Sequence, residues 1–416
     1  MNKYLRIIGE NAQKAFNYKI NKKKKNKVLK KFLILVKKNK LKIINQNKKD
    51  IIIAKKKRLR KNLIDRLELN SKKIDQIVKS INSISKLKDP INITLDKWNR
   101  PNGLIIKKVT IPLGVIGVIY ESRPNVTADV SSLCFKSGNC VILRGGSEAY
   151  FSNKIIVNLF RKALKLNNVD QNYVQFIENK DRKLVDLILS KMEKYIDIII
   201  PRGGKNLVKK VQSMSSVPFI GHLEGICHTY IDKDVDLKLA TKIVHNAKLR
   251  NTSICGATET ILFHEKIIKK IGIKILKDLE DNGCKIIGDN KIRKFYNKKI
   301  KKASIKDWSK EYLAPTVSVK SVKNIDEAIH HINKYGTMHT DCIITQNKKM
   351  AKKFLNEVKS SIAMHNTSTQ FADGEEFGFG GEVGISTNIL PPRGPVGLNQ
   401  LVSYKYQITS KGVVRK

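Results

Sequence analysis

Long apolar runs are missing from this sequence, and their absence excludes a membrane-spanning helix. No stretch of the 416 residues is both long enough and apolar enough to cross a bilayer. Residues 1–10 also lack the apolar core and the small-residue cleavage site of a signal peptide. The six cysteines are spread along the chain without close spacing, so they do not form a disulfide framework. We therefore expect a cytoplasmic protein with no membrane partner.

Acidic residues are also scarce. The chain has 36 Asp and Glu against 82 Lys and Arg, a formal net charge of +46. An excess of this size can indicate a nucleic-acid partner. The lysine runs, however, are scattered, are seldom interleaved with aromatic residues, and alternate with Ile and Asn in segments that have apolar stripes. We therefore expect a solvated basic surface without nucleic-acid function, and tight DNA or RNA binding at physiological salt would contradict this.

The length and the apolar content of 41% predict two or more domains, each with its own core. Residues 1–90 have apolar positions at three- and four-residue spacing, for example Val28, Phe32 and Val36, which predicts helices up to Pro90. A Pro-Asn-Gly turn within residues 97–111 predicts a β-hairpin.

Apolar strands then alternate with helices. Strands are predicted at 115–119, 140–143, 173–177 and 196–200, with helices at about 128–136, 153–166 and 184–191. This alternation predicts a doubly wound parallel sheet, so the fold class is α/β. A second α/β stretch is expected over about 228–364, and a glycine-rich segment at 377–384 precedes a strand at 401–408.

Two strand-to-helix turns have the same pattern, Leu143–Ser147 and Pro201–Lys205, and each contains Arg-Gly-Gly. Paired glycines let backbone amides approach an anion, and the following helix adds its partial positive charge. Arg202 and Lys205, or Arg144, would be able to pair with a phosphate. Neither turn matches Gly-x-Gly-x-x-Gly or the P-loop, so ordinary tight turns with exposed basic residues explain each of them equally well.

Cys255 has the surroundings of a reactive thiol. An amide-rich segment precedes it and a strand-like run follows it, while Gly256 leaves room for a substrate carbonyl to approach the backbone. Lys248 and Arg250 would favour the thiolate, which is the nucleophilic form. A buried structural cysteine is the alternative.

A metal site is not expected. His222, Glu224, Cys227 and His228 are close in sequence, but strand alternation would turn Cys227 and His228 to opposite faces. The remaining histidines share no spacing and are expected to be ordinary packed or surface residues.

Several long segments resemble one family. The first is Ile111–Thr127, which contains Tyr120-Glu-Ser-Arg-Pro-Asn125. Others lie at 136–148, 198–205, 222–228, 371–374, 381–386 and 393–397. Through these segments the chain resembles the gamma-glutamyl phosphate reductases, the proline-biosynthesis branch of the aldehyde dehydrogenase superfamily. The resemblance covers essentially the whole chain, although the segment Arg250–Ile254 lacks the proline expected in this family.

The resemblance implies three parts. Residues 1–94 and 112–223 would form an NADP-binding domain, 224–364 a catalytic domain, and 95–111 with 390–416 an oligomerisation hairpin and tail. It implies Cys255 as the nucleophile and Glu311 as the residue that holds the nicotinamide ribose. The implied NADP-binding turns comprise Arg144, Gly145, Gly146 and Ser147, and Arg202, Gly203, Gly204 and Lys205.

The implied reaction is NADPH-dependent reduction of gamma-glutamyl phosphate to glutamate semialdehyde through a cysteine thioester. Ser122 or Asn125 would stabilise the oxyanion together with the Cys255 amide. Candidates for binding the substrate's carboxylate or phosphate are Arg123, Asn246, Lys248 and Arg393. A homo-oligomer is expected, and a glutamate kinase is a possible partner because it would supply the acyl phosphate. The alternatives are a phosphate-independent aldehyde dehydrogenase and a basic binding protein that has lost activity.

Overall fold

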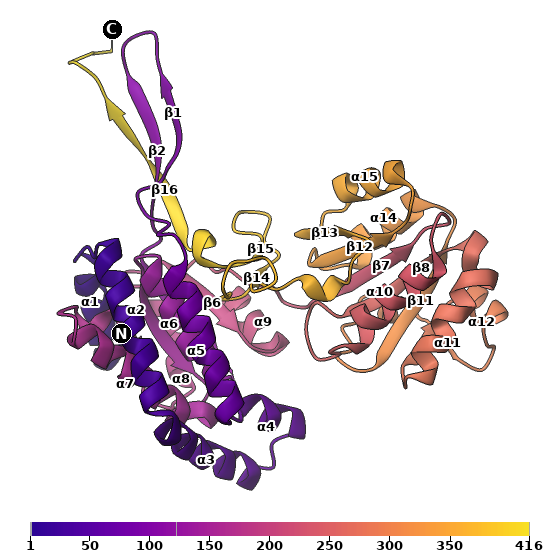
Figure 1. Cartoon of the computed structure of the whole chain (residues 1–416), viewed down its shortest axis with the longest axis horizontal. Helices are drawn as coiled ribbons and strands as arrows, with labels where there is room; N and C mark the ends of the chain where they lie inside the picture. Colours follow the sequence, from indigo (N-terminus) through magenta and orange to yellow (C-terminus); the bar gives the residue numbers. More distant parts are fainter. Residues whose placement is uncertain (1, 122, 416) are drawn as a thin grey trace. The chain divides into compact units, whose positions relative to one another are not determined.

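The computed structural model describes residues 2–121 and 123–415, and the chain divides into two compact units (Figure 1). Unit 1 comprises Met1–Gly221, Gly378–Gly384 and Pro395–Lys416. Unit 2 comprises His222–Phe377 and Ile385–Gly394. The chain therefore passes from unit 1 into unit 2 after Gly221, and short C-terminal segments return to unit 1.

Unit 1 is built on a parallel sheet with the strand order β5-β4-β3-β6. The strands are β3 (Val115–Tyr120), β4 (Cys140–Gly145), β5 (Val174–Phe176) and β6 (Ile198–Arg202). Tyr120 is in register with Gly145 on one side and with Arg202 on the other. The carboxyl ends of β3, β4 and β6 therefore coincide, so both Arg-Gly-Gly turns lie beside the end of β3. The predicted parallel sheet is confirmed.

Helices surround this sheet within unit 1 (Figure 1). They are α1 (Lys3–Phe16), α2 (Lys22–Lys38), α3 (Lys40–Lys56), α4 (Lys61–Leu67), α5 (Ser71–Lys86), α6 (Pro124–Lys136), α7 (Tyr150–Lys165), α8 (Lys183–Lys191) and α9 (Lys205–Met214). The apolar stripe predicted on α2 is buried, and its Phe32 packs on Phe160 of α7 with ring centroids 4.5 Å apart. Helix α6 begins at Pro124, four residues earlier than predicted, because proline is well suited to the first turn of a helix.

Unit 2 has its own parallel sheet, with the order β10-β9-β11-β8-β7-β12-β13. These strands are β7 (Cys227–Ile231), β8 (Thr258–His264), β9 (Lys285–Gly288), β10 (Lys301–Lys302), β11 (Thr316–Val322), β12 (Thr340–Ile344) and β13 (Ile362–His365). The helices are α10 (Leu237–Leu249), α11 (Ile273–Asp281), α12 (Asn290–Phe295), α13 (Ile305–Trp308), α14 (Ile325–Tyr335) and α15 (Lys348–Glu357). Near the C-terminus, β14 (Ile385–Ser386) pairs with β15 (Gly394–Pro395). The second predicted α/β stretch is thus confirmed.

A separate antiparallel sheet joins the predicted hairpin to the C-terminal tail. Its order is β1-β2-β16, with β1 (Thr94–Asn99), β2 (Ile105–Pro112) and β16 (Val402–Thr409). Gly103 adopts a φ of 85° in the connecting turn, a backbone conformation that glycine allows without strain. Figure 1 shows the three strands side by side, and most residues of β1 and β16 are exposed.

Candidate functional site

The turn after β6 already holds an anion of the protein itself. The Gly204 N–H, at the N-cap of α9, donates to Oε2 of Glu121 over 2.9 Å. A Cβ on Gly203 would lie 2.7 Å from the carboxyl carbon of Glu121, so glycine is needed for this close approach. The turn therefore binds a carboxylate where the sequence predicted a phosphate. Glu121 was not among the predicted site residues, although it lies in the family-like segment that follows β3.

The two predicted arginines are engaged within unit 1. Arg144 is only 7% exposed, and it donates through Nη1 to the Gly145 carbonyl and through Nη2 to the carbonyls of Lys180 and Asp181. Arg202 lies 3.5 Å from the carboxylate of Glu382. The expectation that Arg144 pairs with a phosphate is therefore corrected: burial directs its guanidinium to backbone carbonyls, where it supports the turn.

Most other residues of the two turns are more exposed to solvent than Arg144. Ser147 and Gly146 are half-buried, and Gly203, Gly204 and Lys205 are exposed. Gly145 is required by packing, because a Cβ there would lie 2.2 Å from Nδ2 of Asn153 on α7.

Cys255 lies in unit 2, in a tight turn between α10 and β8. The Ala257 N–H donates to the Ile254 carbonyl over 3.1 Å, which closes the turn around the cysteine. All six cysteines of the chain are free thiols; five are buried, whereas Cys255 is half-buried. The thiol predicted to be the nucleophile is thus the accessible one, and the five others are buried within the protein.

Gly225 packs directly against the backbone of Cys255 in this turn. A Cβ at Gly225 would lie 2.2 Å from the Cys255 carbonyl oxygen and 2.6 Å from its Cβ. The expectation for Gly256 is corrected, because Gly256 is buried and a Cβ there would face the Thr369 carbonyl at 3.1 Å. The glycine that permits the backbone of Cys255 to sit where it does is therefore Gly225.

Glu311 lies next to this support. Its Oε1 accepts a hydrogen bond of 2.9 Å from the Gly225 N–H. Family resemblance assigns Glu311 to the nicotinamide ribose. In the structure, Glu311 also holds the Gly225 backbone that packs against Cys255. Because Gly225 touches Cys255, Glu311 and the cysteine belong to one local cluster.

The prediction that Lys248 binds the substrate is wrong. It is fully buried and its Nζ lies 2.5 Å from Oε2 of Glu259, which is also fully buried. Glu259 in turn accepts from the Leu313 N–H over 3.1 Å. Lys248 is therefore a structural cation that links α10, β8 and the segment that carries Glu311. It is not available to a substrate, and the predicted influence of Lys248 on Cys255 is not supported. Arg250 is also engaged, because its Nε donates to Gln370 over 2.9 Å.

Two histidines lie beside Cys255. One ring nitrogen of His222, one of His339 and the Cys255 sulfur all lie within 4.8 Å of one another. Sequence spacing contains no signal of this cluster, because the three positions are separated by 33 and 84 residues. Of the residues that are close in sequence, Cys227 donates its thiol to the Cys255 carbonyl, while His228 on the opposite face of the strand pairs with Asp341.

The other candidates are distributed over both units. Asn125 is exposed on α6 of unit 1 and lies 3.5 Å from Asp129, and Arg123 is the N-cap residue of the same helix. Ser122 lies outside the described residues. Arg393 is exposed in unit 2 and donates to the Lys359 carbonyl over 2.7 Å.

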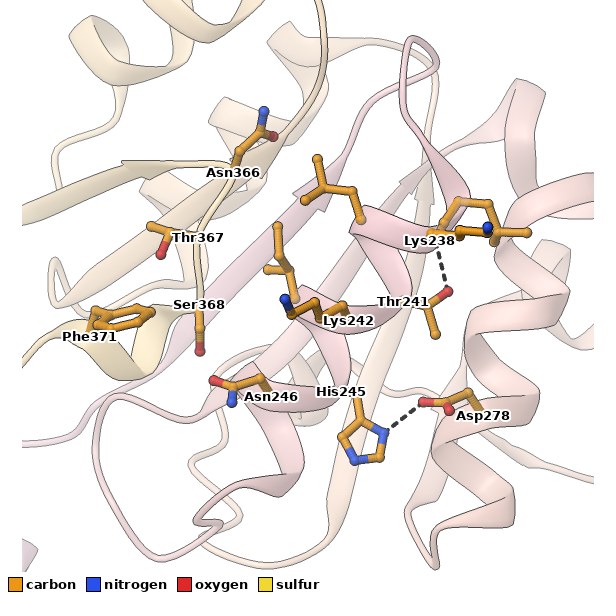
Figure 2. A pocket seen from close by; sticks show the side chains of 13 residues that line it. Lys238, Thr241, Lys242, His245, Asn246, Asp278, Asn366, Thr367, Ser368 and Phe371 are labelled. Atoms are coloured by element: carbon orange, nitrogen blue, oxygen red, sulfur yellow. Dashed lines mark hydrogen bonds and ion pairs between the residues drawn. The ribbon is translucent and has the colours of Figure 1, made fainter.

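Asn246 lines a pocket of about 930 Å³ in unit 2. Figure 2 shows Asn246 and His245 on α10, with Thr367, Ser368 and Phe371 on the facing segment. Cys255 is not among the residues that line this pocket. Asn246 therefore remains a substrate candidate from family resemblance alone.

The chain is similar to known proteins in both sequence and structure. The sequence profile of the aldehyde dehydrogenase family matches residues 5–284 and 301–388. The gamma-glutamyl phosphate reductase of Bartonella tribocorum is 44% identical over 362 residues, which cover 87% of this chain and 88% of the relative. That of Brucella suis is 45% identical over 362 residues, covering 87% and 86%.

A solved structure matches over nearly the whole chain. The gamma-glutamyl phosphate reductase of Thermotoga maritima superposes with a TM-score of 0.96 at 40% identity, covering 99% of this chain and 100% of the other. The fold is therefore the α/β fold of aldehyde dehydrogenases.

Proposed function

Because the chain belongs to the aldehyde dehydrogenase family, we propose that it reduces gamma-glutamyl phosphate to glutamate semialdehyde, a step of proline biosynthesis. Relatives that match over most of the chain are named gamma-glutamyl phosphate reductase, and the family implies a nicotinamide cofactor. The observation that carries the proposal is the accessible Cys255 thiol in its glycine-supported turn.

Cys255 acts as the nucleophile. Its thiolate attacks the acyl carbon of the substrate, a carbon–sulfur bond forms, and the bond to the phosphate oxygen breaks. Phosphate is already a good leaving group, so this step does not need a base that activates water. The Cys255 amide is a donor toward the developing oxyanion, and Ser122 or Asn125 is proposed as a second donor. When the carbon–sulfur bond breaks at the end of the reaction, the aldehyde leaves and the thiolate is restored.

NADP is the proposed cofactor, and its phosphates would bind at the turn after β6, either in place of the Glu121 carboxylate or against its charge. The Gly204 N–H already donates to a carboxylate, and exposed Lys205 adds a positive charge at the same helix start. Gly203 and Gly204 would hold the pyrophosphate, the turn of Arg144, Gly145, Gly146 and Ser147 would face the adenosine ribose, and Glu311 would hold the nicotinamide ribose. When bound, the cofactor supplies the hydride that reduces the Cys255 thioester.

The substrate candidates are Arg123, Asn246 and Arg393, because Lys248 is committed to Glu259. Glutamate kinase is the proposed partner, as the source of the acyl phosphate.

No helix in the described part of the chain is long and apolar enough to span a membrane. A cytoplasmic location is proposed from the family's biosynthetic role, and six free thiols are compatible with a reducing compartment.

The decisive assay follows NADP reduction with glutamate semialdehyde, with and without phosphate. We expect turnover only with phosphate, since phosphate must cleave the thioester in this direction. Cys255→Ala should reduce turnover by a factor of roughly 10³ or more, because no nucleophile remains. Cys284→Ala, which removes a buried cysteine of the same unit, serves as the control and should retain activity.

Turnover that does not depend on phosphate would support the rival aldehyde dehydrogenase reading. Full activity of Cys255→Ala would rule out the proposed nucleophile, and the absence of any turnover in the parent would favour a binding protein.

A further inference from the structure

Three potential metal ligands converge in unit 2 from distant parts of the sequence. His222 begins the unit, Cys255 lies in the turn before β8, and His339 immediately precedes β12. Their ligand atoms lie within 4.8 Å of one another, and the imidazole rings of the two histidines are 4.9 Å apart in an edge-to-face arrangement. Imidazole nitrogen and thiolate sulfur are the ligand types that zinc prefers.

Hydrogen bonds prepare His222 for such a role. Its Nδ1 lies 2.8 Å from the Ile385 carbonyl, which can only accept, so Nδ1 carries the proton and donates it. The other ring nitrogen, Nε2, then keeps its lone pair. Metal-binding histidines commonly donate their second nitrogen to a carbonyl in this way, because the bond fixes both tautomer and ring orientation.

His339 supplies the independent observation. Its side chain is fully buried, and its Nε2 makes no hydrogen bond within the described residues. Nδ1 lies 2.9 Å from the Thr340 hydroxyl, so that side of the ring is satisfied. A buried ring nitrogen without a partner is costly unless a ligand completes it.

We propose that Cys255, His222 and His339 bind a zinc-like divalent cation, with water in the fourth position. Zinc bond lengths of about 2.0–2.3 Å place tetrahedral ligand atoms about 3.5 Å apart, so the three atoms need to close by about 1 Å. Small rotations of the three side chains would supply this. Since the sulfur is also the proposed nucleophile, the bound cation inhibits the enzyme by occupying it. This inhibition rests on the proposed function, whereas binding of the cation does not.

A second histidine pair in unit 2 shows that a buried ring nitrogen without a partner does not by itself mark a metal site, because Nε2 of His228 and Nε2 of His331 also make no hydrogen bond within the described residues. His228 and His331 are buried, their rings lie 5.6 Å apart, and the ring of His331 also makes an edge-to-face contact with Trp308. In the part of the chain that the structure describes, no cysteine joins that pair in a group of potential metal ligands. His222 and Cys255, by contrast, are half-buried, so a cation from solvent has access to the site.

The test titrates the full-length protein with Co²⁺ and Zn²⁺, without substrate. Calorimetry should give one strong site, and Co²⁺ should produce the thiolate-to-metal charge-transfer absorption of a cysteine ligand. Cys255→Ser should abolish that absorption. His222→Ala and His339→Ala should each weaken binding by about tenfold or more, because each removes a ligand. His245→Ala, a partly exposed histidine of the same unit, is the matched control and should bind like the parent.

A second measurement covers the case in which the buried His339 variant fails to fold. Zinc should protect Cys255 of the parent from alkylation by iodoacetamide, as read by mass spectrometry, and His222→Gln should lose this protection. EDTA should reverse both the protection and the inhibition of turnover.

The proposal is wrong if Co²⁺ gives no thiolate absorption, or if the folded His222 and His339 variants bind like the parent. It is also wrong if His245→Ala loses the site. If the parent protein binds zinc and zinc protects Cys255 from alkylation, but the protein has no reductase activity, then the proposed metal site stands and only the proposed function is wrong.

Discussion

Glu121 shows how a single residue changes the interpretation of a motif. The second Arg-Gly-Gly turn predicts an anion site, and the structure fills it with the Glu121 carboxylate at the start of α9. A cofactor phosphate at Gly204 would have to replace this carboxylate or bind against its charge. Glu121 therefore acts in the present conformation as an internal competitor at the turn.

Replacing the carboxylate should strengthen cofactor binding. A charge at a helix N-terminus is worth about 0.3–1 kcal/mol, so Glu121→Gln should lower the Kd for NADPH by about two- to fivefold. Fluorescence titration with NADPH measures this directly. Glu10→Gln, which removes an exposed carboxylate on α1, is the control and should leave the Kd unchanged. Weaker binding by Glu121→Gln would mean that the carboxylate assists the cofactor.

At the scale of elements, the buried Lys248–Glu259 pair joins α10 to β8 on either side of the Cys255 turn. Glu259 also accepts from Leu313, and Glu311 accepts from Gly225, which touches Cys255. This series of contacts positions the turn. Buried charges are expensive to desolvate, so the pair contributes geometry here more than net stability.

The pair predicts a pH dependence of stability. Desolvation raises the pKa of Glu259 from 4.5 to about 7, although Lys248 opposes the shift. Between these values the native chain retains a proton that the unfolded chain has released. The contribution of Glu259 to the free energy of unfolding therefore falls as pH rises through this window and is level above it.

Urea denaturation across the window measures the effect. Glu259→Gln should remove this part of the slope, because the amide does not titrate. Glu265→Gln, at an exposed ion pair of the same unit, should keep the slope of the parent. An unchanged slope in Glu259→Gln would show that Glu259 is ionised throughout.

At the scale of the whole molecule, the β1-β2-β16 sheet exposes apolar side chains that a single copy of the chain does not cover. Tyr404, Tyr406 and Ile408 alternate along β16, so they share one face of the strand, and all three are about half exposed. A three-stranded sheet with exposed apolar residues and unpaired edges is a natural surface for self-association. The predicted homo-oligomer is therefore expected to form through this sheet.

Two matched variants test the oligomer. Tyr406→Lys combined with Ile408→Lys should shift the mass measured by light scattering toward the monomer, because two charges would be buried in the contact. Gln407→Lys places a charge on the opposite face and should leave the mass unchanged. A monomeric parent protein would contradict the proposed assembly.

The sequence by itself determined the local elements and singled out Cys255 as the candidate nucleophile. Apolar periodicity, paired glycines and a Pro-Asn-Gly turn act over a few residues, so the strands, the hairpin and the two turns could be predicted. Cys255 was identifiable because its neighbours and the family resemblance lie in continuous segments.

Tertiary structure decided which side chains meet. His222 and His339 approach Cys255 only because β7, β8 and β12 are neighbours in one sheet, a pairing that sequence spacing does not contain. It also decided that Lys248 and Arg144 are buried and that Glu121 caps α9. The sequence suggested ligand contacts for Lys248 and Arg144, but burial and partners, which depend on packing, assigned these two side chains to the protein itself.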